Sequence, residues 1–259
     1  MNRRKFLANV SIATIAGTVT VSGLKLQSQV LAKSKTKWGY IGKRGAENWG
    51  KLSPEFSTCK FGITQSPIDI NSTVRAKLSE IYTCYDSTNL RILNNGHTIK
   101  VNYDSGSKLK LDGEEYELLQ FHFHHPSEHK VDTKNFPMEL HLVHKNNKGS
   151  LAVLGVFLKE GKENQTLQKI WEVLPTKKTS EKTFYNITID ASDLLPQDKD
   201  SYRYFGSLTT PPCSEIVKWI VYQEPVEISK AQIQKFAEIF PMNARPVQKI
   251  NRRFILQSN

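Results

Sequence analysis

Alternating polar and apolar residues recur along the chain with the two-residue period of β-strands. Two such segments, Leu90–Leu93 and Thr98–Tyr103, are separated by Asn94-Asn95-Gly96, a typical turn sequence. This pattern predicts two neighbouring strands joined by a tight turn. Strands are also expected over four further segments: Leu118–His125, Glu139–His144, Leu151–Leu158 and Ile216–Tyr222.

The segment Leu151–Leu158 is almost wholly apolar, which indicates a central strand buried on both faces. Helical periodicity is weaker. It is found over Asn164–Leu174 and Ser229–Phe240, each of which is followed by a proline. No internal repeat or low-complexity linker divides the chain. We therefore expect a mainly β fold, with a large, mostly antiparallel central sheet and a few short surface helices in a single domain.

The N-terminus has a pattern typical of export signals. Arg3-Arg4 precedes a mildly apolar run to about Val21, and Val30-Leu31-Ala32 fits a small-residue cleavage site. We expect residues 1–32 to be a cleaved twin-arginine signal and residues 33–259 to be the mature domain, exported to the periplasm or secreted. An uncleaved membrane anchor is the alternative, but the run is short and rich in Ser, Thr and Gly, so no stable anchor is expected.

Basic residues outnumber acidic ones, with a formal net charge of +11, or +7 without the four basic residues of segment 1–32. Lys and Arg are scattered among Asp and Glu, so nucleic-acid binding is not expected. Apolar residues make up 38% of the chain and charged residues 24%, which suits a globular domain. The cysteines Cys59, Cys84 and Cys213 allow three pairings, and spacing alone does not choose among them. Export favours a disulfide.

Histidines are concentrated in one part of the chain. Six of the seven lie between Gln120 and His144, and the seventh, His97, lies just upstream. Because residues two apart on a strand share a face, Gln120, His122 and His124 point one way, and the intervening phenylalanines point into the core. Histidine is the commonest metal ligand, so the clustering predicts a single metal site.

The segment beginning at Glu139 offers the third ligand, His141, if it pairs with the first histidine strand. Three neutral imidazoles with one open position are typical of catalytic zinc, whereas a structural site would have a fourth protein ligand. Gln120 and Glu139 each stand two residues before a ligand on the same face. We expect them to accept the ligands' second N–H, although polar residues on a solvated face would show the same spacing. The remaining members of the cluster are expected to be structural or surface residues: His125 and His144 because of their strand phase, and His129 because it follows Pro126-Ser127 in a bend.

The chain resembles the α-class carbonic anhydrases from Trp38 to its C-terminus. Seven ordered motifs carry the resemblance: Trp38-Gly39-Tyr40, Gln65–Ile70, Leu93–His97, Gln120–His124, Ser127–His129, Glu139–His144 and Gly206–Pro212. The resemblance implies a zinc enzyme, a carbonate dehydratase, that hydrates carbon dioxide reversibly to bicarbonate and a proton. It implies that His122, His124 and His141 hold Zn²⁺, and that zinc-bound hydroxide attacks the carbon.

The resemblance also implies roles for residues outside the metal site. Thr209 orients the hydroxide, Glu128 accepts the Thr209 hydroxyl proton, and His97 shuttles the product proton to buffer. Tyr40 and Asn95 belong to a water network, and Cys59 forms a disulfide with Cys213. The substrate pocket is formed by five residues: Val143, Val153, Leu208, Thr210 and Trp219. Cys84 has no matching partner and is expected to stay free.

Two residues depart from the family pattern: His125, beside the ligand strand, and Lys100, at a cavity position that is often uncharged. Lys100 would lower the pKa of His97 if it pointed inward. The alternative function is a non-catalytic carbonic-anhydrase-like binding module, but all three ligands, Thr209 and Glu128 are present. The expected partner is only the small-molecule substrate, and the chain is expected to be a monomer or a homodimer.

Overall fold

Residues 36–258 are described by a computed structural model, so the predicted export signal lies outside the described residues. The strands are β1 (Asp69–Ile70), β2 (Val74–Arg75), β3 (Tyr82–Cys84), β4 (Thr88–Asn94), β5 (Ile99–Asn102), β6 (Lys108–Leu111), β7 (Glu114–His124), β8 (Lys130–Val131), β9 (Met138–Lys145), β10 (Leu151–Glu160), β11 (Lys182–Ile189), β12 (Ser201–Gly206), β13 (Val217–Tyr222), β14 (Val226–Ile228) and β15 (Leu256–Gln257). The α-helices are α1 (Trp49–Leu52), α2 (Thr58–Phe61), α3 (Gln165–Glu172) and α4 (Lys230–Ile239). Short 3₁₀ turns are η1 (Gly42–Arg44), η2 (Ala46–Asn48), η3 (Pro54–Phe56) and η4 (Ala191–Leu194).

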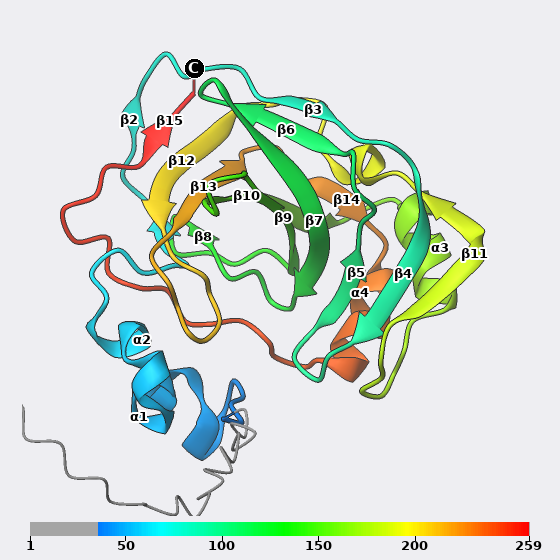
Figure 1. Ribbon diagram of the computed structural model, residues 1–259, viewed down its shortest axis with the longest axis horizontal. Coiled ribbons are helices and arrows are strands. Elements are labelled where there is room, and N and C mark those ends of the chain that lie inside the picture. Colours follow the sequence, from blue (N-terminus) through cyan, green and yellow to red (C-terminus); the bar gives the residue numbers. More distant parts are fainter. Residues whose placement is uncertain (1–35, 259) are drawn as a thin grey trace, which may run out of the picture. The chain divides into compact units, whose positions relative to one another are not determined.

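The fold is dominated by one 13-stranded sheet, shown in Figure 1. Its main path runs β11-β4-β5-β7-β9-β10-β13-β12-β15-β2. The mainly β prediction is confirmed, and each predicted strand lies within or overlaps a strand of this sheet. Most pairs are antiparallel, but β10 runs parallel to β13 and β14, and β15 runs parallel to β2, so the sheet is mixed. The long connection from β10 to β13, which contains α3, β11 and β12, allows the parallel pairing.

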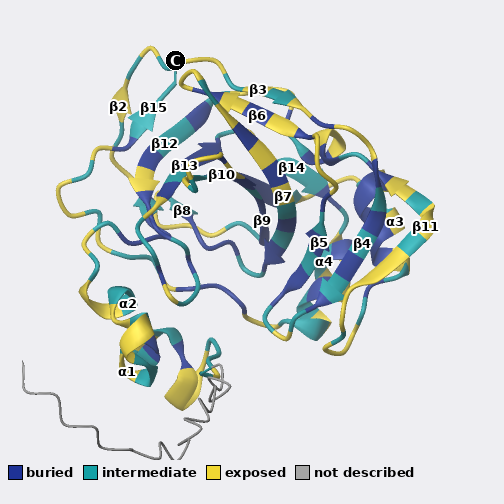
Figure 2. Ribbon diagram, in the orientation of Figure 1, coloured by how far each residue is buried: buried dark blue, intermediate teal, exposed yellow. Residues whose placement is uncertain are grey.

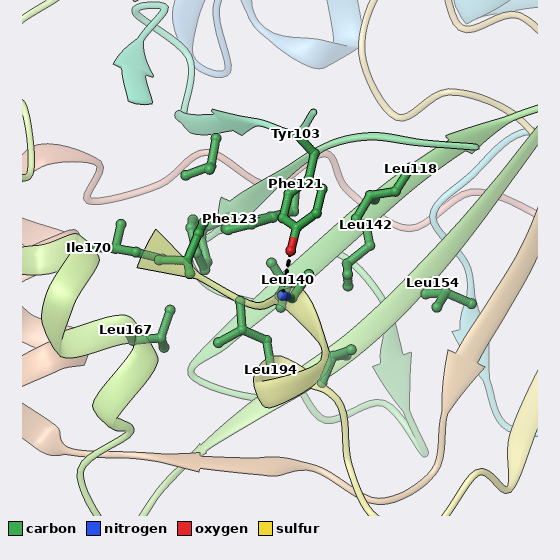
Figure 3. Packing of buried hydrophobic residues seen from close by; sticks show 14 of the residues in the cluster. Tyr103, Leu118, Phe121, Phe123, Leu140, Leu142, Leu154, Leu167, Ile170 and Leu194 are labelled. Atoms are coloured by element: carbon green, nitrogen blue, oxygen red, sulfur yellow. Dashed lines mark hydrogen bonds between the residues drawn. The ribbon is translucent and has the colours of Figure 1, made fainter. Parts of the chain in front are cut away.

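The centre of the sheet is buried on both faces. Figure 2 shows β9 and β10 mostly in the colour of buried residues, and seven consecutive residues of β10 are buried. This confirms the prediction from the apolar run. On one face, Phe121 and Phe123 are fully buried and pack with Leu140 and Leu142, as Figure 3 shows. The opposite face of the same strands is therefore free to carry the histidines.

Both predicted helices are present and begin at side-chain caps. The Asn164 side chain accepts from the backbone N–H of Leu167 at the start of α3. Ser229 and Gln232 form a capping box at the start of α4. Such caps satisfy N–H groups that lack partners within the helix. Along residues 36–258 no helix is both long enough and apolar enough to span a bilayer.

A disulfide joins Cys59 of α2 to Cys213, 154 residues later. This pairing agrees with the one implied by the resemblance. Cys84 is exposed and free, as expected. The bridge connects the N-terminal helical segment to the loop that follows Thr209 and Thr210.

Candidate metal centre and active-site cavity

Three histidines converge on one face of the central sheet. His122 of β7 lies directly opposite His141 of β9 in the antiparallel register, and His124 is two residues further along β7. One ring nitrogen from each of the three lies within 4.8 Å of the others. The cause is the strand period, which places His122 and His124 on one face and their phenylalanine neighbours in the core.

The second nitrogen of each imidazole is held by a hydrogen bond. The contacts are Nδ1 of His122 with Oε1 of Gln120 at 3.0 Å, Nδ1 of His124 with the carbonyl of Asn243 at 2.8 Å, and Nε2 of His141 with Oε1 of Glu139 at 2.8 Å. Each partner is an acceptor, so the held nitrogen carries the proton. The other nitrogens, Nε2 of His122, Nε2 of His124 and Nδ1 of His141, keep free lone pairs. Gln120 and Glu139 thus make the contacts that strand spacing predicted.

Glu139 also holds His129, which lies in the bend after β7. Its carboxylate accepts from the backbone N–H of His129 at 2.8 Å and contacts Nδ1 of the same ring at 2.7 Å. The other ring nitrogen contacts the Tyr204 hydroxyl at 2.7 Å, and that hydroxyl donates to Ser66. His129, Glu139 and His141 lie close enough to suggest a second metal cluster, but their polar atoms are engaged with one another. His129 is therefore structural, as its place in the bend after Pro126-Ser127 predicted.

Burial favours the neutral form of two of these imidazoles, His122 and His124. Desolvation, followed by His124, His141 and Lys100, lowers the pKa of His122 well below its usual value. Desolvation also lowers the pKa of His124, and the charge of Glu128 only partly opposes it. A neutral imidazole is the form that binds a metal ion, so no proton must first be removed near neutral pH.

The carboxylate of Glu128 faces the free nitrogens of His124 and His141. Its Oε2 lies 3.5 Å from Nε2 of His124 and 3.9 Å from Nδ1 of His141. Oε2 of Glu128 and Nε2 of His124 are both buried without a hydrogen-bond partner. Such atoms are rare in proteins because they lose their hydration without compensation. A cation would use the free lone pair of His124 and offset the carboxylate charge, so these residues fit a bound metal ion.

The expected hydrogen bond between Thr209 and Glu128 is not formed in this structure. Oε1 of Glu128 accepts from the backbone N–H of Arg245 at 2.8 Å, and Oε2, which has no partner, is turned toward the histidines. Thr209 is also buried, with 5% of its surface exposed. Both residues are therefore buried, but no hydrogen bond joins the Thr209 hydroxyl to the Glu128 carboxylate.

A small cavity of about 170 Å³ opens over the histidines. It is lined by Trp38, Tyr40, Asn95, His97, Thr98, Lys100, Gln120, His122, His124 and Thr210. The predicted shuttle and both predicted water-network residues thus share one cavity with His122 and His124. Desolvation and the charge of Glu128 raise the pKa of Tyr40 well above its usual value, so its hydroxyl stays protonated.

His97 lies at the wall of this cavity. Its ring stacks on Trp38 with the centroids 3.7 Å apart and the planes 6° apart. The Asn95 side chain accepts from the backbone N–H groups of His97 and Thr98 and so shapes the turn. Burial, followed by the charge of Lys178, lowers the pKa of His97. Lys100 also lines the cavity, but it acts on His122, its partner in the strand register, and the cation that lowers the pKa of His97 is Lys178.

Four predicted substrate residues form an apolar cluster beside the histidines. Val153 of β10 lies opposite Val143 of β9 and opposite Trp219 of β13, and Leu208 packs against the same cluster. The Trp219 ring centroid lies 4.8 Å from that of His141. These four do not line the small cavity, whereas the fifth predicted substrate residue, Thr210, does.

Sequence reasoning missed three residues that act on this site: Asn243, Arg245 and Lys178. All three stand in irregular segments, where no periodicity marks an inward position. The other two histidines expected outside the metal site are structural. His144 is fully buried and contacts the Tyr85 hydroxyl at 2.7 Å, and His125 contacts the carbonyl of Pro241 through Nδ1.

Comparisons with known proteins agree with this arrangement. A family model of eukaryotic-type carbonic anhydrase matches residues 44–259. A carbonic anhydrase from a Nostoc species is 48% identical over 248 residues, covering 93% of this chain and 94% of that protein. The α-carbonic anhydrase of Thermovibrio ammonificans, solved with the inhibitor sulfanilamide, has a TM-score of 0.83 and 49% identity, covering 85% of this chain and 99% of that one.

The fold also occurs in dioscorin, which was solved in complex with ascorbate. That structure has a TM-score of 0.80 and 29% identity, covering 85% of this chain and 97% of that one. The family match spans most of the chain, and the identity to the Nostoc protein is far above that to dioscorin. The chain therefore belongs to the eukaryotic-type, or α-class, carbonic anhydrase family of enzymes.

Proposed function

We propose that this protein catalyses the zinc-dependent, reversible hydration of carbon dioxide to bicarbonate and a proton. One observation carries the proposal. Three imidazoles, each held by a hydrogen bond to one of its nitrogens, bring one ring nitrogen apiece within 4.8 Å of the others beside a small cavity. Three neutral nitrogen ligands leave a fourth position open, which is the arrangement of catalytic zinc.

His122, His124 and His141 are the residues that would hold the zinc ion. When bound, Zn²⁺ acts as a Lewis acid and lowers the pKa of coordinated water to about 7, an effect for which carbonic anhydrase is itself the reference case. Gln120 and Glu139 fix the orientation of two of the rings and raise their basicity. Because no ligand is a carboxylate, the site retains the full charge of the cation.

Thr209 and Glu128 are proposed to orient the attacking oxygen. Glu128 has a free acceptor at Oε2. If the Thr209 hydroxyl donates its only proton to that acceptor, it can interact with the attacking oxygen only through its lone pairs. It then accepts a hydrogen bond and directs the oxygen toward carbon.

Carbon dioxide is uncharged and a weak hydrogen-bonding partner, so an apolar surface suits it. Val143, Val153, Leu208 and Trp219 supply such a surface beside His141. The product proton must leave after each turnover. His97, at the cavity wall, is the proposed relay to buffer because an imidazole titrates near neutral pH.

We further propose that the protein is exported and that its small-molecule substrate is its main partner. The disulfide supports a location outside the reducing cytoplasm. The proposed cleavage after residue 32 would be tested by N-terminal sequencing of protein recovered from the periplasm or the medium. Recovery of the intact N-terminus would contradict it.

The function is tested by carbon dioxide hydration together with zinc content. We expect one zinc ion per chain, loss of activity on zinc removal, recovery on zinc addition, and loss of both zinc and activity in His141→Ala. Activity that survives zinc removal and this substitution would overturn the proposal. A folded, zinc-loaded protein without hydration activity would instead favour a binding module.

The relay is tested with His97→Ala. We expect turnover in weak buffer to fall by about tenfold to a hundredfold, in line with a lost general acid–base group. Added imidazole should restore it. Turnover that does not depend on buffer in either protein would reject the role of His97.

A further inference from the structure

Asn243, in the irregular segment after α4, is fully buried, and every polar group it has is used. Its backbone N–H donates to the His125 carbonyl at 3.0 Å, and its own carbonyl contacts Nδ1 of His124 at 2.8 Å. The side-chain oxygen accepts from the His125 N–H at 2.7 Å. The side-chain nitrogen donates to the carbonyls of His97 and Phe123, both at 3.0 Å.

The two carbonyls that accept from the Asn243 side chain belong to different parts of the site. Phe123 lies between two proposed metal ligands on β7, whereas His97 is the proposed proton relay in the turn between β4 and β5. The backbone pairing of β5 with β7 ends at Lys100, opposite His122, so it does not extend to the turn. Side chains make the connection there instead of a strand ladder.

Thr98 makes a second connection at the same point. Its hydroxyl donates to the Phe123 carbonyl at 2.6 Å and accepts from the Phe123 N–H at 3.2 Å. The Phe123 carbonyl thus accepts from both Thr98 and Asn243. Only the Asn243 side chain also contacts the carbonyl of His97 itself.

We propose that Asn243 is a positioning residue that couples the proton relay to the metal-binding strand. It fixes the backbone of His97 relative to β7 while its own backbone orients His124. This inference rests on the proposed function and adds to it a residue that fixes the relay's position. An asparagine suits the task because one planar amide offers two donors and an acceptor in fixed directions.

The coupling predicts a selective kinetic defect. Proton transfer depends on the relay being held at a fixed position, and a displacement of about 1 Å can cost up to a hundredfold in rate. The attack on carbon dioxide does not involve His97. The constant kcat includes the step of proton removal, whereas kcat/KM reports only the steps before it. Loss of the Asn243 side chain should therefore lower kcat more than kcat/KM.

Asn146 serves as the matched control for Asn243, because it is a buried asparagine with a purely structural role. It is also buried, and its side-chain oxygen accepts from the N–H groups of Lys148 and Ser150. It lies in the turn between β9 and β10, and none of its hydrogen bonds reaches the cavity residues. Asn146→Ala therefore removes comparable hydrogen bonds without affecting the coupling.

The experiment compares Asn243→Ala, Asn243→Asp and Asn146→Ala in the zinc-loaded protein. Asn243→Asp conserves size and the acceptor but loses both donated bonds. In weak buffer we expect kcat to fall by about tenfold in both Asn243 variants, with recovery in imidazole and a smaller change in kcat/KM. Asn146→Ala should keep the wild-type kcat even where its unfolding temperature is lowered.

Hydrogen–deuterium exchange gives a readout that does not require activity. The amides of residues 94–98 should exchange faster in the Asn243 variants than in the wild type, and not in Asn146→Ala. If the Asn243 variants do not fold, Thr98→Val removes the second connection and should also speed exchange at the turn. Unchanged exchange would overturn the coupling even if the enzyme proved inactive, and an unchanged kcat in an active enzyme would do the same.

Discussion

Among single residues, Glu139 illustrates how a charge is kept in the protein interior. Burial alone would raise its pKa, but His129 and His141 outweigh this effect and hold the pKa well below its usual value. Oε1 of the carboxylate contacts both rings, at 2.7 and 2.8 Å. A buried carboxylate without such partners would be strongly destabilising, so the position of Glu139 depends on an unhindered approach to both histidines.

Gly155 of β10 permits that approach. It lies opposite His141, and a Cβ at this position would lie 3.1 Å from Oε1 of Glu139 and 3.3 Å from Val221. The carboxylate cannot withdraw without losing a histidine contact. We therefore expect Gly155→Ala to weaken zinc binding by about tenfold to a hundredfold, as seen when groups that orient metal ligands are disturbed. Competition with a chelator measures this affinity.

Gly39→Ala is the control, because a Cβ there meets no atom within 4 Å. It should bind zinc as the wild type does. Equal zinc affinity in Gly155→Ala and the wild type would show that the Glu139 contacts do not depend on this glycine.

His144 makes stability depend on pH. Burial lowers its pKa from 6.5 to about 4. Between these values the unfolded chain binds a proton that the folded chain does not, so stability from this residue is complete above pH 6.5 and decreases as the pH falls toward 4. The loss across this range is about 3 kcal/mol.

The His144→Gln variant tests this contribution, because glutamine is polar and does not titrate. It should be less stable at neutral pH, since the contact with Tyr85 is disturbed. Its free energy of unfolding should nevertheless change less between pH 6.5 and 4.5 than that of the wild type. Urea titrations at several pH values measure how the free energy of unfolding changes with pH. An equal change in the two proteins would exclude His144 as the cause of the pH dependence.

At the scale of secondary-structure elements, the faces of a strand could be predicted from the sequence, but the pairing of strands could not. The two-residue period of β7 was enough to place His122 and His124 on one face and the phenylalanines on the other, because strand geometry is local. The register of β7 against β9 was only a conditional expectation. The register of this pairing shifts between Leu118 and Gln120, and the pattern of polar and apolar residues in β7 does not indicate that shift.

The remaining contributors come from segments without periodicity. Asn243 and Arg245 follow α4, and their contacts span 117 to 186 residues of sequence. Such contacts depend on the path by which the chain returns to the sheet, and this path cannot be predicted from the local pattern of polar and apolar residues. The family resemblance supplied the proposed roles of Thr209 and His97, whereas the contacts of Asn243 and Arg245 became visible only in the structure.

The segment between α3 and β11 influences His97, the proposed relay, through Lys178. The backbone of this segment is tied to the turn after β4, because the N–H of Thr179 donates to the Asn94 carbonyl at 2.9 Å. A Cβ on Gly96 would lie 3.3 Å from the Lys178 side chain, next to His97. The ammonium group disfavours a protonated ring, which adds to the effect of burial on the pKa of His97.

We therefore expect Lys178→Gln to raise the pKa of His97 toward its usual value, while burial still keeps it lower. The pKa is measured from the NMR titration of the ring and from the pH dependence of kcat in weak buffer. Lys177→Gln is the control, because Lys177 is exposed and is not among the groups that shift the pKa of His97. A pKa unchanged in Lys178→Gln, or raised equally by both variants, would contradict this electrostatic effect.

At the scale of the whole molecule, the site is held by both ends of the described chain. Trp38 and Tyr40 line the cavity from the N-terminal segment. Arg245, near the C-terminus, donates to the carbonyls of Ser66 and Cys59 through its buried guanidinium. Burial lowers the pKa of this guanidinium to about 10, so it remains charged at neutral pH. These contacts attach the N-terminal helices to the sheet that carries the histidines.

The Cys59–Cys213 disulfide is a further link between the N-terminal helices and the rest of the chain, and it joins residues 154 positions apart in the sequence. A loop of this length loses much conformational entropy when it is closed in the unfolded state, so replacing both cysteines by serine should lower the free energy of unfolding by between about 2 and 5 kcal/mol. Hydrogen bonds from Arg245 to the Cys59 carbonyl and from Gln65 to the Cys213 carbonyl do not need the bridge. The folded site should therefore persist, and zinc affinity should change less than stability.

Guanidinium chloride unfolding of the double variant measures the loss, with Cys84→Ser as the control because its thiol is exposed and free. The control should unfold at the wild-type denaturant concentration. A double variant that is as stable as the wild type would mean that the other contacts between these segments already restrict the unfolded chain. A double variant that is folded but releases zinc would mean instead that the bridge positions the site directly, through the loop that carries Thr209 and Thr210.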